Sequence, residues 1–196
     1  SSFAALMGLF GLYLAVAGIL VGIGVLIQIR RSEGQLSGTG LAVVGIILSA
    51  KFLGWGAYFQ YTDYVNELPP GYVRVNFPKQ IAEKQFIIED NQRKIHPDVE
   101  PFVDQRIYLK GYVWDSRVSE NMTEFVLLKD NGECCFGGDP APHDMIVVRM
   151  NDGKTFDYST GLIGVAGTFR ANPNPPLGES VYVMEADHVA RAKTVF

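Results

Sequence analysis

The sequence predicts a two-part protein, an N-terminal transmembrane α-helical hairpin followed by a mainly β soluble head that we expect to be an OB-like five-stranded Greek-key barrel. Residues 3–29 contain no charge and are long enough to cross a bilayer core of about 30 Å. A second apolar run, residues 41–61, follows a short loop. From residue 106 onward, apolar side chains recur with the period of two that is typical of β-strands.

The first apolar run is interpreted as a true membrane span and not as a cleavable signal. Signal peptides have an apolar region of about 7–15 residues behind a basic start, whereas this run is longer and begins with uncharged Ser1 and Ser2. The chain lacks an initiator methionine, so we expect that residues before Ser1 are missing from this sequence. The predicted domains are a hairpin at 1–61, a neck with irregular or helical structure at 62–105, and the OB-like domain at 106–196.

The only loop between the spans contains Arg30 and Arg31. Because Lys and Arg in short loops mark the cytoplasmic side of a membrane, we expect this loop to be cytoplasmic. The protein is then predicted to lie in the inner, cytoplasmic membrane, with two spans and with the head on the periplasmic, extracytoplasmic side.

Small residues recur at alternating steps of four and three along both spans, which keeps one face of each helix narrow. In the first span they are Ala4, Gly8, Gly11, Ala15, Gly18 and Gly22, and in the second Gly38, Ala42, Gly45, Ser49 and Gly56. Such narrow faces allow helix backbones to approach each other in lipid. We interpret them as a helix-packing seam of the hairpin, which could equally bind a partner subunit; the alternative is that membrane helices are simply rich in glycine.

Lys51 is an intramembrane charge, about ten residues into the second apolar run. A lysine within a span costs from about 2.5 kcal/mol upward. Phe52, Trp55 and Tyr58 resemble an interfacial aromatic belt, so one interpretation is a lysine that extends towards the interface. The other is a partner carboxylate or a lipid phosphate beside the ammonium group.

The neck contains Pro69, Pro70 and Gly71, which prevent the second helix from continuing. Residues 79–93 are weakly compatible with a short helix, and Pro97 and Pro101 follow it. The formal net charge is −4, and nearly all charges lie after residue 60. An acidic head argues against nucleic acid as a partner, because nucleic-acid binding normally requires clustered Lys and Arg.

Five segments of the head read as strands: residues 107–114, 124–128, 145–150, 162–169 and 181–186. Gly111 and Gly167 lie inside the first and fourth, where the strands of a small barrel would bend or bulge. This pattern favours the OB-like barrel, with a small sandwich as the alternative. OB-like domains bind oligonucleotides, sugars or proteins, so the fold alone assigns no role.

The most specific chemistry lies in residues 130–144, which contain both cysteines, Cys134 and Cys135, and His143. Outside the cytoplasm, adjacent cysteines could form a vicinal disulfide. Alternatively, they could bind zinc or copper together with His143 and with Asp139 or Asp144, because thiolate and imidazole suit those ions. The third interpretation is a pair of buried structural thiols.

Two segments resemble known families. The glycine-rich stretch 28–42 resembles a bacterial two-helix membrane domain of unknown function. Residues 110–112, 125–132 and 134–138, which include a Cys-Cys-Phe-Gly-Gly run, are similar to bacterial exported proteins of unknown function with a cysteine-containing loop. Some of these are similar to proteins encoded beside metal-responsive ABC-type transporters, which implies a metal role, although the usual loop has one cysteine.

The chain has no Ser-His-Asp motif, phosphate-binding glycine loop or paired-carboxylate signature, so no catalytic or cofactor-binding residue is predicted. The sequence favours a non-enzymatic accessory or structural subunit of an envelope membrane complex, in contact with membrane lipid and other subunits. The alternative is a metal-handling or thiol-redox envelope protein built around Cys134 and Cys135 and associated with a transporter.

Overall fold

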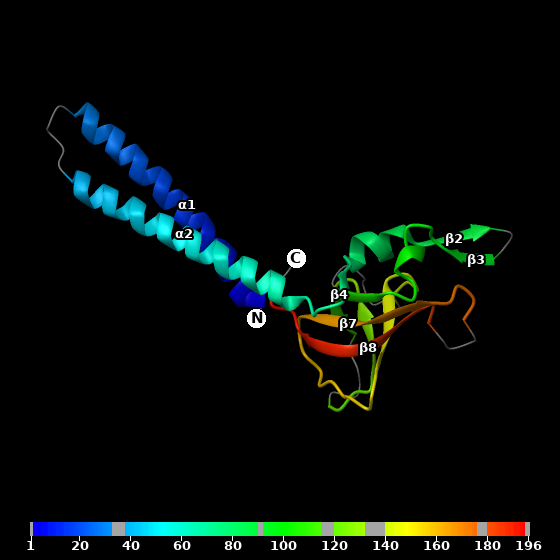
Figure 1. Ribbon diagram of the computed structural model, residues 1–196. Helices are drawn as coiled ribbons and strands as arrows, with labels where there is room; N and C mark the ends of the chain where they lie inside the picture. Colours follow the sequence, from blue (N-terminus) through cyan, green and yellow to red (C-terminus); the bar gives the residue numbers. More distant parts are fainter. Residues whose placement is uncertain are drawn as a thin grey trace. The chain divides into compact units, whose positions relative to one another are not determined.

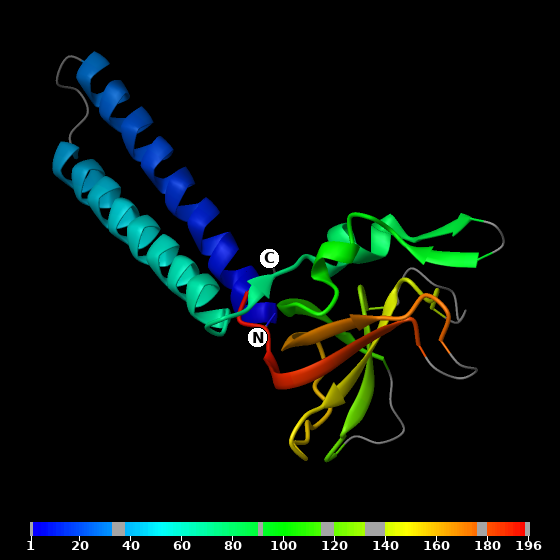
Figure 2. The same cartoon turned by 45° about the vertical axis from the view of Figure 1, so that its right-hand side comes forward.

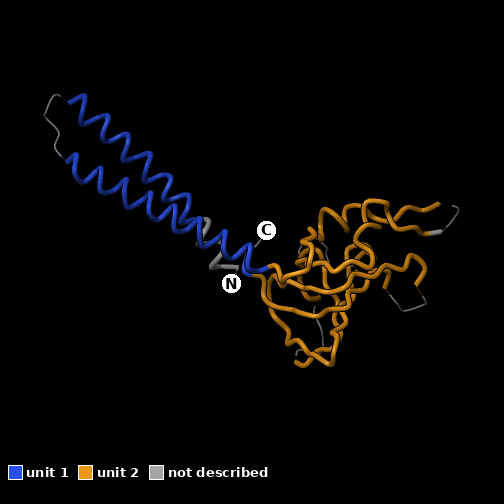
Figure 3. Tube along the Cα trace, in the orientation of Figure 1, with its two compact units in different colours: residues 1–67, 193–196 blue, residues 68–192 orange. Residues whose placement is uncertain are grey.

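The computed structural model describes residues 2–32, 38–89, 92–114, 120–131, 140–175 and 180–194, with the side chains of the first helix described from Phe10 onward. The chain divides into two compact units (Figure 3). Unit 1 comprises residues 1–67 and 193–196, and unit 2 comprises residues 68–192.

Unit 1 is an antiparallel helical hairpin of α1, Ser2–Arg31, and α2, Thr39–Glu67 (Figure 1). Both helices are long and apolar enough to span a membrane, with mean hydropathies of 2.5 and 1.7 over an 18-residue stretch within Phe10–Arg31 and Thr39–Glu67, respectively. Helix α2 continues past the predicted span and ends two residues before Pro69, because proline cannot continue a helix and also disfavours a helical residue before it.

The helices contact each other along one narrow stripe on each. In α1 the less exposed residues include Leu12, Ala15, Gly18, Gly22 and Leu26, and in α2 they include Ala42, Ile46, Ser49, Leu53 and Gly56. These positions repeat at steps of three and four, which is the spacing of an antiparallel pair that packs along its length. The large apolar side chains outside the stripe, such as Leu20 and Phe52, remain exposed.

Unit 2 contains a six-stranded mixed sheet (Figure 2). Its strands are β1 Val73–Arg74, β4 Arg106–Val113, β5 Glu124–Leu128, β6 Met145–Met150, β7 Leu162–Ala171 and β8 Tyr182–Arg191. Their order is β1-β4-β5-β6-β8-β7, and β4 also pairs with β7 from Arg106↔Thr168 to Tyr112↔Leu162. The β1–β4 and β6–β8 pairs are parallel, and the others are antiparallel.

The five strands predicted from the period-two pattern are confirmed as β4 to β8, and so is a mainly β head. Two strands run further than predicted, β7 to Ala171 and β8 to Arg191. The two-residue strand β1 was not predicted, because two residues are too few to show a period.

The predicted short helix over residues 79–93 is only partly correct. Helical turns occupy η1, Phe77–Ile81, and η2, Ala82–Lys84, and a third, η3, spans Glu100–Phe102. Beyond η2 the chain forms an antiparallel hairpin of β2, Phe86–Glu89, and β3, Gln92–Ile95. The pair Ile87 and Ile88 suits an extended strand, since β-branched residues pack well on a pleated surface.

The core of unit 2 consists of the inward-facing side chains of β4 to β8 together with the segment before them. Fully buried members include Phe77, Ile81, Ile107, Leu109, Leu127, Ile146, Ile163, Phe169, Tyr182 and Met184. Along β6 and β8, buried and less buried positions largely alternate, as the period of two requires, whereas β4 and β7 contain runs of consecutive buried residues.

Two glycines allow strands to approach closely within this core. A Cβ added at Gly167 would lie 2.1 Å from the carbonyl oxygen of Glu185, and one at Gly111 would lie 2.5 Å from the carbonyl oxygen of Leu128. The β7–β8 register shifts between Ala166 and Gly167, so the irregularity expected at Gly167 is present.

Candidate functional site

The small residues of the hairpin contribute unequally to the contact between α1 and α2. A Cβ added at Gly18 would lie 2.6 Å from Ser49 Oγ, and one at Gly22 would lie 2.5 Å from Ile46 Cγ1. Among the described side chains of α1 and α2, only Ala15 is buried. At these positions, a larger side chain would push the helices apart.

Other small residues of the predicted seam have no such contact. A Cβ added at Gly11 or Gly45 would meet no described atom within 4 Å. Gly38 lies in the left-handed region with φ of +127° and immediately precedes α2. Ala42 is half-buried on the α1-facing stripe, while Gly8 lies where the structure describes no side chains.

Lys51 lies in α2 with its side chain exposed. Its position is 180° around the helix from the α1-facing stripe, because steps of 100° per residue place Ala42 and Gln60 opposite to it. Among the described residues, Lys51 has no ion pair or hydrogen bond from its side chain.

The predicted metal or thiol site lies largely outside the described residues, because Cys134 and Cys135 fall in the segment 132–139. His143 is described: its ring contacts the Phe86 ring edge-on at 6.0 Å, and its Nε2 lies 3.6 Å from Asp144 Oδ1. The same Asp144 oxygen lies 2.8 Å from Lys129 Nζ. In the described ranges, no three His, Cys, Asp or Glu side chains gather as a metal ligand set would require.

A polar cluster that the sequence did not predict lies at the start of unit 2. Tyr72 donates its hydroxyl hydrogen to Asp187 Oδ2 at 2.6 Å, and Arg106 donates to the Tyr72 oxygen at 2.7 Å while its guanidinium stacks over the Tyr72 ring at 4.4 Å. Asn151 donates to Asp187 Oδ1 at 3.0 Å, and Lys154 donates to the Asp187 carbonyl at 2.9 Å.

The contacts within this cluster shift the pKa values of its members. The hydrogen bonds from Tyr72 and Asn151 lower the pKa of Asp187. Burial, and then the hydrogen bond to Asp187, raise the pKa of Tyr72, and the hydrogen bond to Tyr72 raises the pKa of Arg106. The arrangement keeps Asp187 charged and Tyr72 neutral at neutral pH. The hydrogen bonds of this cluster therefore stabilise the contact between β4, β8 and the segment before β1.

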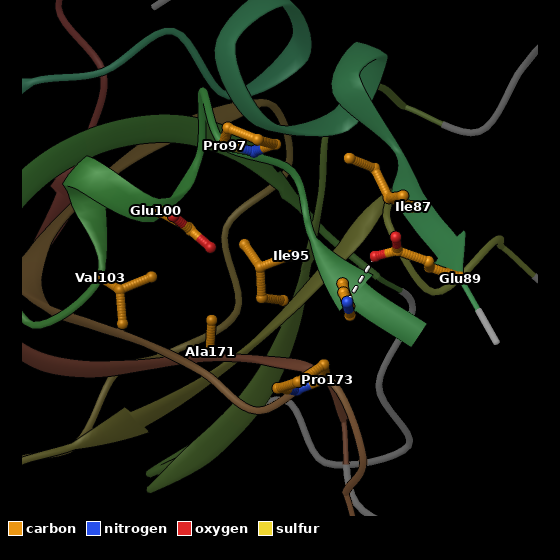
Figure 4. Close-up of a pocket in the computed structure, with 9 residues that line it drawn as sticks. Ile87, Glu89, Ile95, Pro97, Glu100, Val103, Ala171 and Pro173 are labelled. Carbon is orange, nitrogen blue, oxygen red and sulfur yellow. Dashed lines mark hydrogen bonds and ion pairs between the residues drawn. The ribbon is translucent and has the colours of Figure 1, made fainter. Parts of the chain in front are cut away.

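A groove of about 500 Å³ lies between the β2–β3 hairpin, the turn that contains η3, and the end of β7 (Figure 4). Its lining is Ile87, Glu89, Lys94, Ile95, Pro97, Glu100, Val103, Ala171 and Pro173. Glu89 and Lys94 form an ion pair on one side, and Glu100 extends into the groove towards Ile95. The side chain of Glu100 has no ion-pair partner among the described residues.

This groove joins an apolar floor to acidic groups, and it lies beside a two-stranded hairpin. The residues that form it come from positions 87 to 103 and 171 to 173, so proximity in sequence does not reveal it. Ile88 on β2 is exposed over 77% of its surface. Apolar concave surfaces with a few polar groups are the usual form of binding sites in proteins.

The fold and these sites define a class: a hairpin of two membrane-length helices joined to a domain with a mixed β-sheet. The chain belongs to the family described as protein of unknown function (DUF3299), whose model matches residues 69–191. This agrees with the predicted resemblance to proteins of unknown function, and the match begins after the hairpin. The resemblances of the hairpin and of the Cys-Cys-Phe-Gly-Gly loop stay predictions.

A solved structure from the same family is similar to part of the chain. It is a DUF3299 family protein from Pseudomonas aeruginosa PAO1, with 26% sequence identity and a TM-score of 0.38. The similarity covers 50% of this chain and 65% of the Pseudomonas chain. No curated protein matches the sequence.

Proposed function

We propose that this protein is a non-enzymatic accessory or structural subunit of an envelope membrane complex, anchored by its helical hairpin and carrying an interaction domain. The observation that carries the proposal is the apolar outer surface of the hairpin. After α1 and α2 have packed together, side chains such as Leu20, Val21, Leu48 and Phe52 remain at least half exposed. In water, such a surface would be strongly unfavourable, whereas the hydrocarbon core of a bilayer matches it.

The pairing of the strands supports an OB-like barrel as the interaction domain. Pairings β4–β5, β5–β6, β6–β8, β8–β7 and β7–β4 form a ring of five strands, with one parallel step between β6 and β8. Five strands that close in a Greek-key order are the hallmark of OB-like domains. Closure also removes unpaired sheet edges, which suits a domain that binds through grooves and loops.

The groove beside β2–β3 is the binding surface that we assign to this domain. Its floor of Ile95, Val103 and Ala171 suits an apolar side chain, and the acidic Glu100 suits a Lys or Arg next to it. An extended segment of another subunit can present both an apolar side chain and a Lys or Arg next to it. We therefore assign the groove to a protein partner and not to nucleic acid, in keeping with the acidic head.

The proposed orientation places the loop after Arg30 and Arg31 in the cytoplasm and the domain outside it, in the inner membrane. The test uses Ser32→Cys and Asn174→Cys in a chain whose Cys134 and Cys135 are replaced by serine. An impermeant thiol reagent applied to intact cells should label only the Asn174→Cys variant. Labelling of Ser32→Cys alone would reverse the orientation.

Membership of a complex is tested by gentle solubilisation of native membranes, followed by size and composition analysis. We expect the protein in a particle larger than one chain. Replacing Glu100 with Lys should weaken the contact made by the groove, while Lys79→Glu, an exposed charge reversal outside the groove lining, should leave it unchanged. A wild-type chain that is always found alone would remove the proposal.

A further inference from the structure

We propose that Lys51 is the docking point for an acidic side chain in a transmembrane helix of a partner subunit. This inference rests on the proposed function, because it requires the hairpin to lie in a membrane. Three features of Lys51 support it: the direction in which its side chain points, its depth along the hairpin, and the lack of any matching charge in the hairpin.

The direction of Lys51 is away from α1. The α1-facing stripe of α2 includes Ser49 and Leu53, and Lys51 lies between them on the other side of the helix. Its neighbours one turn away, Leu48 and Trp55, are exposed over 51% and 68% of their surfaces. The ammonium group therefore faces whatever surrounds the hairpin.

The depth of Lys51 follows from the register of the two helices. Gly18 lies opposite Ser49, and Leu12 lies opposite Gly56, so Lys51 is level with residues 16–17 of α1. Residues 3–29 carry no charge, and about 20 of them are needed to cross a 30 Å core. Wherever a core of that length is placed within this run, Lys51 stays about 8 Å or more from both of its boundaries.

A lysine at this depth does not reach the interface by extending its side chain. The four-carbon stem of lysine covers about 6 Å, which is less than the distance to either boundary. An interfacial lysine among aromatic residues would have to lie in the outer half of the span. The register with α1 places Lys51 near the middle instead, where a charge needs a partner inside the hydrocarbon.

The hairpin itself supplies no such partner. Helix α1 contains no Asp or Glu, and the acidic residues of α2 are Asp63 and Glu67, about 18 Å and 24 Å further along the helix axis. A second copy of this chain would bring the same sequence, so it also lacks a carboxylate at this depth. The matching charge must come from a different protein.

The surface around Lys51 fits a helix. Gly54, one turn further on the same side, has open space where a Cβ would be, so the backbone of a neighbouring helix can approach closely. Val44 and Tyr58 lie on the same side and are exposed over 53% and 64% of their surfaces. They offer apolar contacts above and below the ion pair.

The experiment uses native membranes that contain the full chain, treated with a lipid-soluble carbodiimide. The reagent activates a carboxyl group, the amine of Lys51 attacks it, an amide bond forms, and the reagent leaves as a urea with the carboxyl oxygen. We expect mass spectrometry to identify Lys51 joined to an Asp or Glu in an apolar helix of another protein. Lys51→Met should abolish this product, and Lys79→Met, an exposed lysine in the head, should not.

The same variants are compared for native particle size. Lys51→Met should reduce recovery of the partner by at least about tenfold, and Lys51→Arg, which keeps the charge, should retain it. If Lys51→Met keeps the partner and no amide forms, the inference is wrong while the proposed function stands. If the stability of the particle depends on anionic lipid, and this dependence requires Lys51, then Lys51 binds a lipid phosphate and the inference is wrong. A wild-type chain that is found without any partner would contradict both this inference and the proposed function.

Discussion

Glu67, the last residue of α2, holds Thr194, which lies beyond the last strand of the chain. Glu67 Oε2 accepts a hydrogen bond from the Thr194 hydroxyl at 2.7 Å, and Oε1 accepts from the backbone N–H groups of Lys193 and Thr194 at 2.6 Å and 3.3 Å. Thr194 is 5% exposed, so its polar groups depend on this carboxylate. The C-terminal segment thereby belongs to the helical unit.

Replacing Glu67 with Ala should release the C-terminal segment. Three hydrogen bonds to a charged acceptor are lost, and the expected destabilisation of the segment is about 1–3 kcal/mol. Hydrogen exchange of the Lys193 and Thr194 amides should become faster. Asp63→Ala, one turn earlier and exposed, is the matched control and should leave that exchange unchanged.

Replacing Tyr182 with Phe should stabilise the head or leave it unchanged. The Tyr182 ring packs at 5.3 Å from both Phe86 and Phe169, and its buried hydroxyl has no hydrogen-bond partner within the described part of the chain. Removing an unpartnered buried hydroxyl recovers up to about 1–3 kcal/mol. Chemical denaturation at pH 7 measures the change, and a clear loss of stability would show that the hydroxyl has a partner.

Alkaline pH should weaken the head through the same tyrosine. Burial raises the pKa of Tyr182 to about 12, above its ordinary value of 10.0. Below pH 10 the free energy of unfolding does not depend on this group, and it falls as the pH rises towards 12, because the unfolded chain releases the proton first. Denaturation midpoints between pH 9 and 12 should fall less in Tyr182→Phe than in the wild type, with the more exposed Tyr158→Phe as the control.

Acid should weaken the tie between Tyr72 and Asp187. The pKa of Asp187 is lowered by hydrogen bonds from Tyr72 and Asn151, so its contribution is present above the pKa of an unfolded aspartate, about 3.9, and is lost as the pH falls below it. Asp187→Asn should make the head less stable at pH 7 and less sensitive to acid. Asp152→Asn, on an exposed turn, should keep the wild-type acid profile.

Replacing Gly18 with Leu should separate the helices, whereas replacing Gly45 with Leu should not. A side chain at position 18 meets Ser49 at once, and one at position 45 enters open space. Overpacking of this kind costs about 1–3 kcal/mol. Pulsed-EPR distances between spin labels at Val25 and Val43, with the native cysteines replaced, should lengthen only in Gly18→Leu. Equal effects of the two changes would contradict the observed packing.

If the head lies outside the cytoplasm as proposed, Cys134 and Cys135 should be linked or shielded and not freely reactive, because an oxidising compartment traps accessible cysteines. A vicinal disulfide gives labelling only after reduction, together with a mass two hydrogens lower. A zinc or copper site gives labelling only after chelation and loses its metal in His143→Ala. Buried thiols are labelled only after unfolding, and rapid labelling of the untreated protein would contradict all three.

The strands of the sheet were predictable because their signal is local. In β4, Leu109 and Val113 are buried and alternate with the less buried Lys110 and Tyr112, and a similar alternation recurs in β6 and β8. The β2–β3 hairpin was missed because charges interrupt its apolar residues. The sequence Asp-Asn at positions 90 and 91, two residue types that favour turns, lies between two short runs with apolar residues and was the signal that could have revealed the hairpin.

The candidate sites were harder to predict because they depend on tertiary contacts. Small residues indicate a narrow helix face, but bulky residues such as Leu12 and Ile46 decide which face meets the other helix. A Cβ added at Gly18 would therefore contact Ser49, whereas one at Gly45 would meet no described atom within 4 Å. The Tyr72–Asp187 bond joins residues 115 positions apart, and no pattern in the sequence connects them.

The pairing of β4 with β7 and of β6 with β8 has a consequence for the synthesis of the protein. Ile107 pairs with Gly167, and Val147 pairs with Val183, so the sheet is assembled from contacts that are distant along the chain. Such contacts form slowly, because closing the long loop between two strands costs conformational entropy before the strand pairing can stabilise the chain. The head therefore cannot complete its sheet while the ribosome is still translating β8, and β6 and β7 lack their β8 neighbour until that strand has emerged.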